Sequence, residues 1–294
     1  MKIQTLSIVV GGNACNASCP YCVSKMTGKV ECSDRVADIN WRNFHKTCEL
    51  AKNSGVNTIL LTGKGEPLLY PAHIHTYLEE LKRYNFPFIE LQTNGIELLN
   101  LNPHALEEWY IDGLTTVSLS CAHWDDNKNR TIFGKHYRSL QEYIKILHRN
   151  KFFVRVSCVM LSDKINDAAR VKHFAKKCKE WGVEQFTVRS VSNSVDEEEV
   201  RNDDDIDKIR VYYWVENHQI SFGKMNEIEN FLDKDATLLL ELAHGAKVYD
   251  YEGQNISLSN CLTSSTNLED IRQLIFYSDG RLMHSWTKKG AILL

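Results

Sequence analysis

The sequence lacks the features that mark membrane, secreted and nucleic-acid-binding proteins. No apolar run approaches the roughly 20 residues that a membrane-spanning helix needs. The apolar stretch of the N-terminal segment is shorter than that of a signal peptide, and no small-residue cleavage site follows it. The net charge is −3, so no overall basic field favours a long nucleic acid. These absences predict a globular protein with no membrane partner and no long nucleic acid as substrate.

The chain also lacks the cysteine pattern of a disulfide framework. Its nine cysteines are an odd number in 294 residues without a secretory signal. We therefore expect a reducing, cytoplasmic location. Free cysteines are often small buried hydrophobes, and Cys48 and Cys178 fit this role because each falls on the apolar stripe of an expected helix.

Strand-like and helix-like segments alternate over the first two thirds of the chain. Apolar residues recur at helical spacing between the strand-like segments, for example at Leu140, Tyr143, Ile144 and Leu147. Strands separated by helices imply βαβ units and a parallel sheet. Six units fit either a partial barrel or a doubly wound sheet, since a closed barrel of this type has eight. The expected strands are residues 5–10, 57–62, 88–93, 116–120, 153–161 and 184–189.

The pattern changes after Arg189. Residues 196–207 are strongly acidic and indicate a solvated loop that runs into a helix at about 206–218. Two hairpin signals follow, at 247–258 and at 272–286, each with a glycine in its turn. The last third therefore indicates an α+β extension packed on the core.

Three cysteines lie close together directly after the first expected strand. They are Cys15, Cys19 and Cys22, separated by three and then two residues. The C-terminal ends of strands are where α/β enzymes place active sites. Thiolates are the ligands of iron–sulfur clusters, and three of them leave one iron of a four-iron cluster open for catalysis. Zinc with a fourth histidine ligand is the alternative, but the nearest downstream histidine, His45, falls in an expected helix.

This spacing resembles the signature of the radical S-adenosylmethionine (SAM) superfamily, as does Tyr21 directly before the last cysteine. The resemblance implies one 4Fe–4S cluster on Cys15, Cys19 and Cys22, with SAM on its open iron and Tyr21 beside the cofactor. It also implies reductive cleavage of SAM to a 5′-deoxyadenosyl radical that abstracts hydrogen from substrate. An external electron donor is then required.

Two later loops resemble SAM-binding motifs of that family. The segment Gly63-Lys64-Gly65-Glu66-Pro67 resembles its Gly-Gly-Glu-Pro motif, with Lys64 inserted between the glycines. Gly65 allows close approach of the backbone, and the resemblance implies that Glu66 binds the SAM ammonium. The segment Thr93-Asn94-Gly95 resembles a motif that lines the SAM site. A simple turn is the alternative for each loop.

Further candidates lie on the fourth, fifth and sixth expected strands. Ser120 resembles the family position that contacts the SAM ribose or carboxylate, and Ser157 is a further SAM-binding candidate. Arg189 suits the SAM carboxylate through a bidentate contact, with a surface ion pair as the alternative. Cys121 could donate a hydrogen atom and His123 could bind substrate. A packed core thiol and a loop imidazole are the alternatives for these two residues.

The order of these motifs implies a partial (β/α)6 TIM-type barrel over residues 1–190. Residues 191–294 then form an α+β extension that covers the barrel mouth. One cluster is expected, because Cys261 is the sole cysteine after Cys178. The expected substrate is a small metabolite or nucleotide, with a peptide second. A non-catalytic iron–sulfur and SAM-binding sensor is the alternative function.

Overall fold

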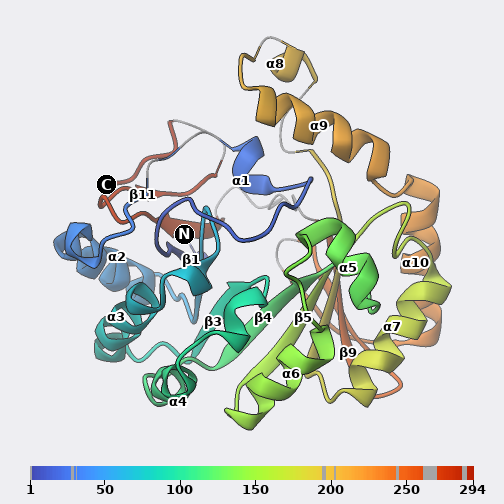
Figure 1. Cartoon of the computed structure of the whole chain (residues 1–294), viewed down its shortest axis with the longest axis horizontal. Coiled ribbons are helices and arrows are strands. Elements are labelled where there is room, and N and C mark those ends of the chain that lie inside the picture. Colours follow the sequence, from blue (N-terminus) through green and yellow to red (C-terminus); the bar gives the residue numbers. More distant parts are fainter. Residues whose placement is uncertain are drawn as a thin grey trace.

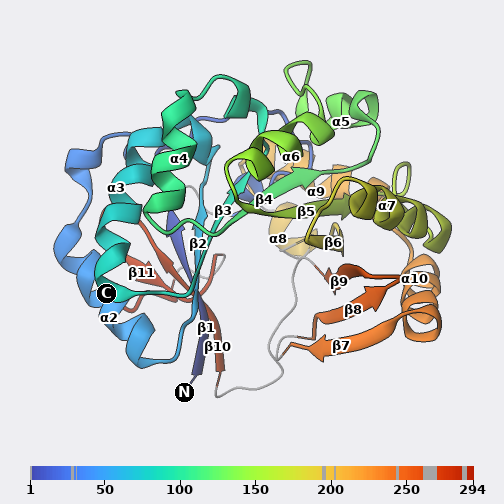
Figure 2. The ribbon, with the colours of Figure 1, turned by 90° about the horizontal axis from the view of Figure 1, so that it is seen from below.

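The computed structural model describes residues 2–27, 30, 32–193, 197–201, 203–242, 245–260, 270–286 and 290–294. Within these ranges the strands form one eleven-stranded sheet in the order β11-β10-β1-β2-β3-β4-β5-β6-β9-β8-β7. Strands β1 to β6 run parallel in chain order. The sheet is an open arc with helices along its outer side (Figures 1 and 2). This architecture confirms the expected α/β fold with a partial barrel.

The strands of this core lie close to their expected ranges. They are β1 Lys2–Val9, β2 Thr58–Thr62, β3 Phe88–Thr93, β4 Thr116–Cys121, β5 Phe153–Met160 and β6 Gln185–Ser190. The helices that accompany them are α1 Val23–Met26, α2 Trp41–Asn53, α3 Pro71–Leu81, α4 Pro103–Ile111, α5 Asp126–Phe133, α6 Leu140–Arg149 and α7 Ala168–Glu180. None of the helices in the described ranges is both long and apolar enough to cross a membrane.

Local sequence explains where these helices begin. Helix α2 follows Asn40, whose side chain accepts a hydrogen bond from the Asn43 amide at 3.0 Å. Helix α7 follows Asp167, which accepts from the Arg170 amide at 2.8 Å. Such side-chain acceptors satisfy backbone amides that a helix N-terminus leaves unbonded. The apolar residues that predicted α6 are all buried against the sheet.

The later elements extend the sheet at both edges. They are α8 Glu197–Arg201, α9 Ile206–His218, α10 Phe222–Asp235, β7 Thr237–Glu241, β8 Lys247–Tyr251, β9 Gln254–Asn260, β10 Asp270–Phe276 and β11 Leu282–Met283. Strand β10 pairs in parallel with β1, and β9 pairs in parallel with β6. Both expected hairpins are present, β8–β9 turning at Glu252-Gly253 and β10–β11 turning near Gly280, where φ is 94°. Whether residues 191–294 also form a separate domain over the barrel mouth stays a prediction.

The two faces of the sheet differ in character. Side chains alternate between faces along a strand, and residues in register on parallel neighbours share a face. The helix-covered, convex face of β4 carries Val117, Leu119 and Cys121, all buried. The concave face carries mostly polar residues, many of them partly exposed: Glu90, Gln92, Thr116, Ser118, Ser120, Arg155, Ser157, Thr187 and Arg189. Polar groups therefore line the inner side of the arc.

Candidate active site

The three clustered cysteines lie on the loop between β1 and α1, and Cys22 is the N-cap of α1. Cys15 is exposed, whereas Cys19 and Cys22 are partly buried. Although Cys15 is exposed, neighbouring protein atoms desolvate its thiol in part and raise its pKa. Burial raises the pKa of Cys19 to about 12. Charges on Cys22 and Cys15 add to the effect on the pKa of Cys19. The three thiols are therefore electrostatic neighbours.

The donor set of this loop fits an iron–sulfur cluster better than zinc. All three groups are thiols, the usual ligands of such clusters. His45 lies on α2, where its ring bonds the Tyr84 hydroxyl at 2.8 Å. Across the described ranges, no three His, Cys, Asp or Glu side chains gather closely enough to hold a metal ion. The three sulfurs must therefore turn toward one another to ligate a cluster.

The loop after β2 packs directly against the start of the cysteine loop. The Glu66 amide donates a hydrogen bond to the Ala14 carbonyl at 2.9 Å. A Cβ atom on Gly65 would collide with the same carbonyl. Glycine at position 65 is therefore required by the close approach of the two backbones.

The Glu66 carboxylate joins this loop to the end of β3. It is buried and accepts hydrogen bonds from the Thr93 hydroxyl at 2.5 Å and from the amides of Asn94 and Leu68, both at 2.9 Å. Burial raises the pKa of Glu66, and these donors act against the rise. The sequence predicted a contact with the SAM ammonium, which stays a prediction. It did not predict the internal hydrogen bonds, which leave one acceptor direction on Oε2.

Asn94 connects the Thr-Asn-Gly turn to the cysteine loop. Its side-chain amide donates to Asn16 Oδ1 at 2.8 Å, and its own Oδ1 accepts from the Ile96 amide at 2.9 Å. Asn16 in turn donates to Glu97 Oε1 at 3.0 Å. The Thr93-Asn94-Gly95 turn is therefore also part of the candidate site, because Asn94 serves both. No sequence motif predicted a role for Asn16 or Glu97, although Asn16 lies between two of the cysteines.

Lys64 holds the other end of the cysteine loop. Its buried ammonium donates to the Thr27 hydroxyl at 2.5 Å, directly after α1. Burial lowers the pKa of Lys64, while the neighbouring thiols of Cys32 and Cys22, when ionised, act in the opposite direction. Together with the bond from Glu66 to Ala14, this contact fixes the cysteine loop on both sides of its three thiols.

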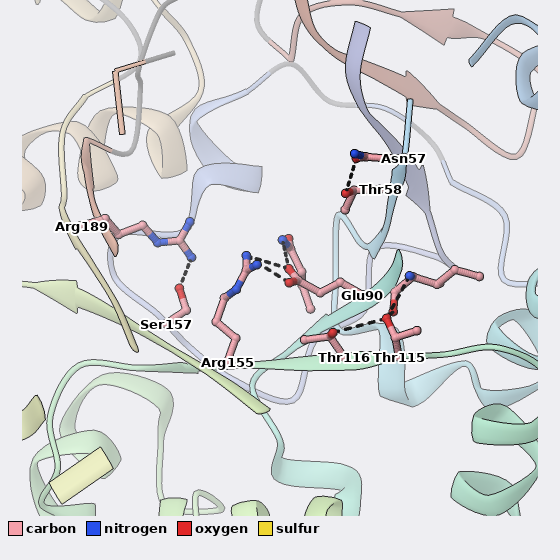
Figure 3. A network of polar contacts seen from close by, with 10 residues as sticks. Asn57, Thr58, Glu90, Thr115, Thr116, Arg155, Ser157 and Arg189 are labelled. Carbon is pink, nitrogen blue, oxygen red and sulfur yellow. Dashed lines mark hydrogen bonds and ion pairs between the residues drawn. The ribbon is translucent and has the colours of Figure 1, made fainter. Parts of the chain in front are cut away.

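Tyr21 and the candidates on β4 to β6 lie beside this assembly. Ser120 and Ser157 are in register on the concave face, and Arg189 Nη2 donates to Ser157 Oγ at 2.7 Å (Figure 3). Burial raises the pKa of the Tyr21 hydroxyl, and the charge of Arg189 lowers it. The Tyr21 ring lies 5.8 Å from the ring of Trp214 on α9. These positions bring four of the predicted SAM-binding residues to one region.

The structure places Cys121 and His123 away from the concave face. Cys121 is fully buried on the convex face of β4, opposite to Ser120, and burial raises the pKa of its thiol. This position matches the packed core thiol that the sequence also allowed. His123 is buried, its Nδ1 accepts from the Asp125 amide at 2.9 Å, and its ring packs on Trp124. A charge on Cys121 would raise the pKa of Tyr21 in the cysteine loop, whereas His123 has no described contact with that loop.

A partly buried ion pair on the concave face was not predicted from the sequence. Arg155 Nη1 lies 3.0 Å from Glu90 Oε2 (Figure 3). Gln92 donates to Glu90 Oε1 at 3.1 Å. The available signal was polar residues at alternate positions, Glu90 and Gln92 on β3 and Arg155 and Ser157 on β5.

The family model for the radical SAM superfamily matches residues 9–178, which is more than half of the chain. The chain belongs to the radical SAM superfamily. Membership implies an iron–sulfur cluster and SAM as cofactors. No curated protein matches the sequence.

Solved structures of radical SAM enzymes share the fold of this radical SAM protein. The structure of anSMEcpe with bound AdoMet is 16% identical, with a TM-score of 0.62 over 100% of this chain and 74% of that chain. Streptococcus suis SuiB, solved with its precursor peptide SuiA, is 14% identical, with a TM-score of 0.57 over 97% of this chain. A radical SAM methyltransferase from Sphaerobacter thermophilus is 14% identical, with a TM-score of 0.55 over 86% of this chain and 66% of that chain. The chain spans 60% of the length of SuiB.

Proposed function

We propose that this protein is an enzyme that cleaves SAM reductively and abstracts hydrogen from a small metabolite or nucleotide. The observation that carries the proposal is a single hydrogen-bonded assembly at the C-terminal ends of β1, β2 and β3. Glu66 bonds Ala14 and Asn94, and Asn94 bonds Asn16 within the cysteine loop. A protein that only held a cluster would have no need of this assembly.

The chain's own residues have distinct roles in this proposal. Cys15, Cys19 and Cys22 hold a single 4Fe–4S cluster. With SAM bound and an electron from an external donor, the cluster supplies cleavage of SAM to methionine and a 5′-deoxyadenosyl radical. Glu66 and Asn94 orient the SAM ammonium through their remaining acceptor directions.

The residues on the later strands complete the SAM site. Arg189, fixed by Ser157, receives the SAM carboxylate. Ser120, beside Ser157 on the concave face, bonds the ribose or the same carboxylate. Tyr21 shields the cofactor from the side of α9, where it contacts Trp214. These contacts hold SAM across the C-terminal ends of the strands.

The polar concave face supports a small polar substrate. Many of its side chains are partly exposed, and they offer hydroxyl, amide and guanidinium groups. A peptide is the second candidate, because SuiB has the same fold and was solved with a precursor peptide. A sensor that binds SAM without turnover is the competing function.

Product analysis of the reduced protein tests the proposal. Protein reconstituted with iron and sulfide under anaerobic conditions, reduced with dithionite and given SAM should form 5′-deoxyadenosine, detected by liquid chromatography and mass spectrometry. Cys19→Ala protein treated in parallel should form none. SAM binding without any 5′-deoxyadenosine would favour the sensor and refute the enzyme.

A further inference from the structure

The concave face carries two arginines whose hydrogen-bonding capacity is only partly used. Arg155 and Arg189 lie on the neighbouring strands β5 and β6, and the side chains of both are drawn toward the inner side of the arc in Figure 3. Each makes contacts through one terminal nitrogen, Arg155 Nη1 to Glu90 and Arg189 Nη2 to Ser157. The Nε atom of each is buried and has no hydrogen-bond partner among the residues that the structure describes.

The unused donors of Arg155 share one edge of its guanidinium. Within the described ranges, all polar contacts of the Arg155 guanidinium are made by Nη1, and both of them are with Glu90. Its Nε and Nη2 therefore have no acceptor among these residues. These two groups lie side by side in the guanidinium plane and match the two oxygens of a carboxylate or phosphate. A buried donor without an acceptor is unfavourable, so this edge favours an oxyanion ligand.

Glu90 and Gln92 fix the direction of this edge. Glu90 is 3% exposed, whereas the Arg155 side chain is 33% exposed, so the pair presents its arginine to the ligand. Gln92 donates to Glu90 Oε1, which Arg155 Nη1 also contacts at 3.4 Å, and so adds a second hold on the carboxylate. Strand β4 lies between β3, which carries Glu90, and β5, which carries Arg155. Its residues in register with these two are Thr116 and Ser118, and both have small side chains. The ion pair therefore spans β4 without a bulky side chain of that strand between its partners.

The two arginines lie at different depths. Arg189 is the fifth of six residues in β6 and so lies near the strand end, beside the SAM-binding candidates. Arg155 is the third of eight residues in β5 and lies deeper on the same face. The charge of Arg155 is balanced by Glu90, whereas the one described hydrogen bond of the Arg189 side chain is to the Ser157 hydroxyl. Each arginine can therefore bind one oxyanion of its own.

We propose that Arg155, oriented by Glu90 and Gln92, is a substrate-binding subsite for a carboxylate or phosphate group. The inference rests on the proposed function, because it assigns Arg189 to the SAM carboxylate and Arg155 to the substrate. It defines the substrate as an anionic small molecule whose oxyanion lies deep in the arc. The hydrogen to be abstracted then lies on the part of the substrate that faces the strand ends.

Calorimetric titration of reconstituted, SAM-saturated protein tests this subsite. The probes are inorganic phosphate and acetate, which distinguish the two oxyanions, and acetamide as a neutral analogue of acetate. Wild-type protein should bind phosphate or acetate but not acetamide. Arg155→Lys keeps the charge opposite Glu90 but loses the paired donors, and should weaken binding at least tenfold. The matched control is Arg170→Lys, which changes an exposed arginine paired with Asp167 and should bind as wild type.

Three outcomes would refute the assignment of Arg155 as a substrate-binding subsite. They are no binding of either oxyanion to wild-type protein, equal binding by Arg155→Lys, or displacement of SAM by the probe. If Arg155→Lys does not fold, the double variant Glu90→Gln/Arg155→Gln removes both charges together and should show the same loss. Formation of 5′-deoxyadenosine is measured on the same wild-type samples. Oxyanion binding through Arg155 without 5′-deoxyadenosine would refute the proposed function and leave the subsite intact.

Discussion

Replacing Glu66 by alanine should destabilise the protein even before any cofactor binds. The Glu66 carboxylate accepts hydrogen bonds from Leu68, Thr93 and Asn94. A buried donor left without an acceptor costs about 1–3 kcal/mol, so loss of all three gives about 3 kcal/mol or more. Glu66→Gln keeps one acceptor oxygen and turns an amide NH2 toward the Asn94 amide, so it should cost about 1–3 kcal/mol.

Urea denaturation of the apoprotein measures this effect without the cluster. The expected order of stability is wild type, then Glu66→Gln, then Glu66→Ala. The neighbouring exposed Glu79→Ala, whose described ion-pair partner is the half-exposed His75, serves as the control and should change the free energy of unfolding by less than about 0.5 kcal/mol. An alanine variant as stable as wild type would refute the internal role of Glu66.

The same variants separate the internal role from SAM binding. A charge-assisted contact with the SAM ammonium contributes about 1.5–3 kcal/mol, so Glu66→Ala should weaken SAM binding by roughly ten- to a hundredfold. The variant is assayed well below its unfolding midpoint, so that folded protein is compared with folded protein. Unchanged SAM affinity in folded Glu66→Ala protein would exclude the contact with the ammonium.

Four further predictions concern the loops and the cluster. Gly65→Ala should lower the iron bound on reconstitution, in a ferrozine assay, whereas Gly223→Ala should not, because a Cβ there meets no atom. Lys64→Met removes the bond to the end of the cysteine loop and should speed the loss of iron to a chelator; an unchanged rate would contradict that role. Burial lowers the pKa of His123 to about 4, so the unfolded state binds more protons between about pH 4 and 6.5 and stability falls as pH falls. From pH 7 to 5 this loss is on the order of 2 kcal/mol and should shrink in His123→Asn. Cys261 lies outside the described residues, and Cys261→Ser should leave about four irons per chain, whereas a value near eight would indicate a second cluster.

The elements of the core could be predicted because their signals are local. Short segments rich in apolar and β-branched residues, separated by helical apolar patterns, located β1 to β6. The helix at 206–218 has the bounds of α9 because Asp205 caps its N-terminus. The pairing of β10 with β1 and of β9 with β6 was not predictable in this way. Parallel pairing of strands that are distant in the chain depends on the whole sheet and leaves no local pattern in either strand.

The site shows the same division between local and non-local information. The order of the motifs predicted that Cys15, Glu66 and Asn94 belong to one region. The bonds that join them depend on backbone approach, as between Gly65 and Ala14, and on side chains such as Asn16 that have no motif of their own. These contacts cannot be predicted from the spacing of residues along the chain.

The open sheet and the polar concave face have a common physical explanation. A closed eight-stranded barrel fills its interior with bulky branched side chains, which need no partner. Here the inner rows carry serine, threonine, glutamine, glutamate and arginine, which must bond one another, water or a ligand. Glu90 is satisfied by Arg155 and Gln92, but the Nε atoms of Arg155 and Arg189 are not satisfied by the described residues. A sequence that placed these groups inside a closed barrel would leave them buried without partners, so the same residues that favour a ligand also disfavour closure of the sheet.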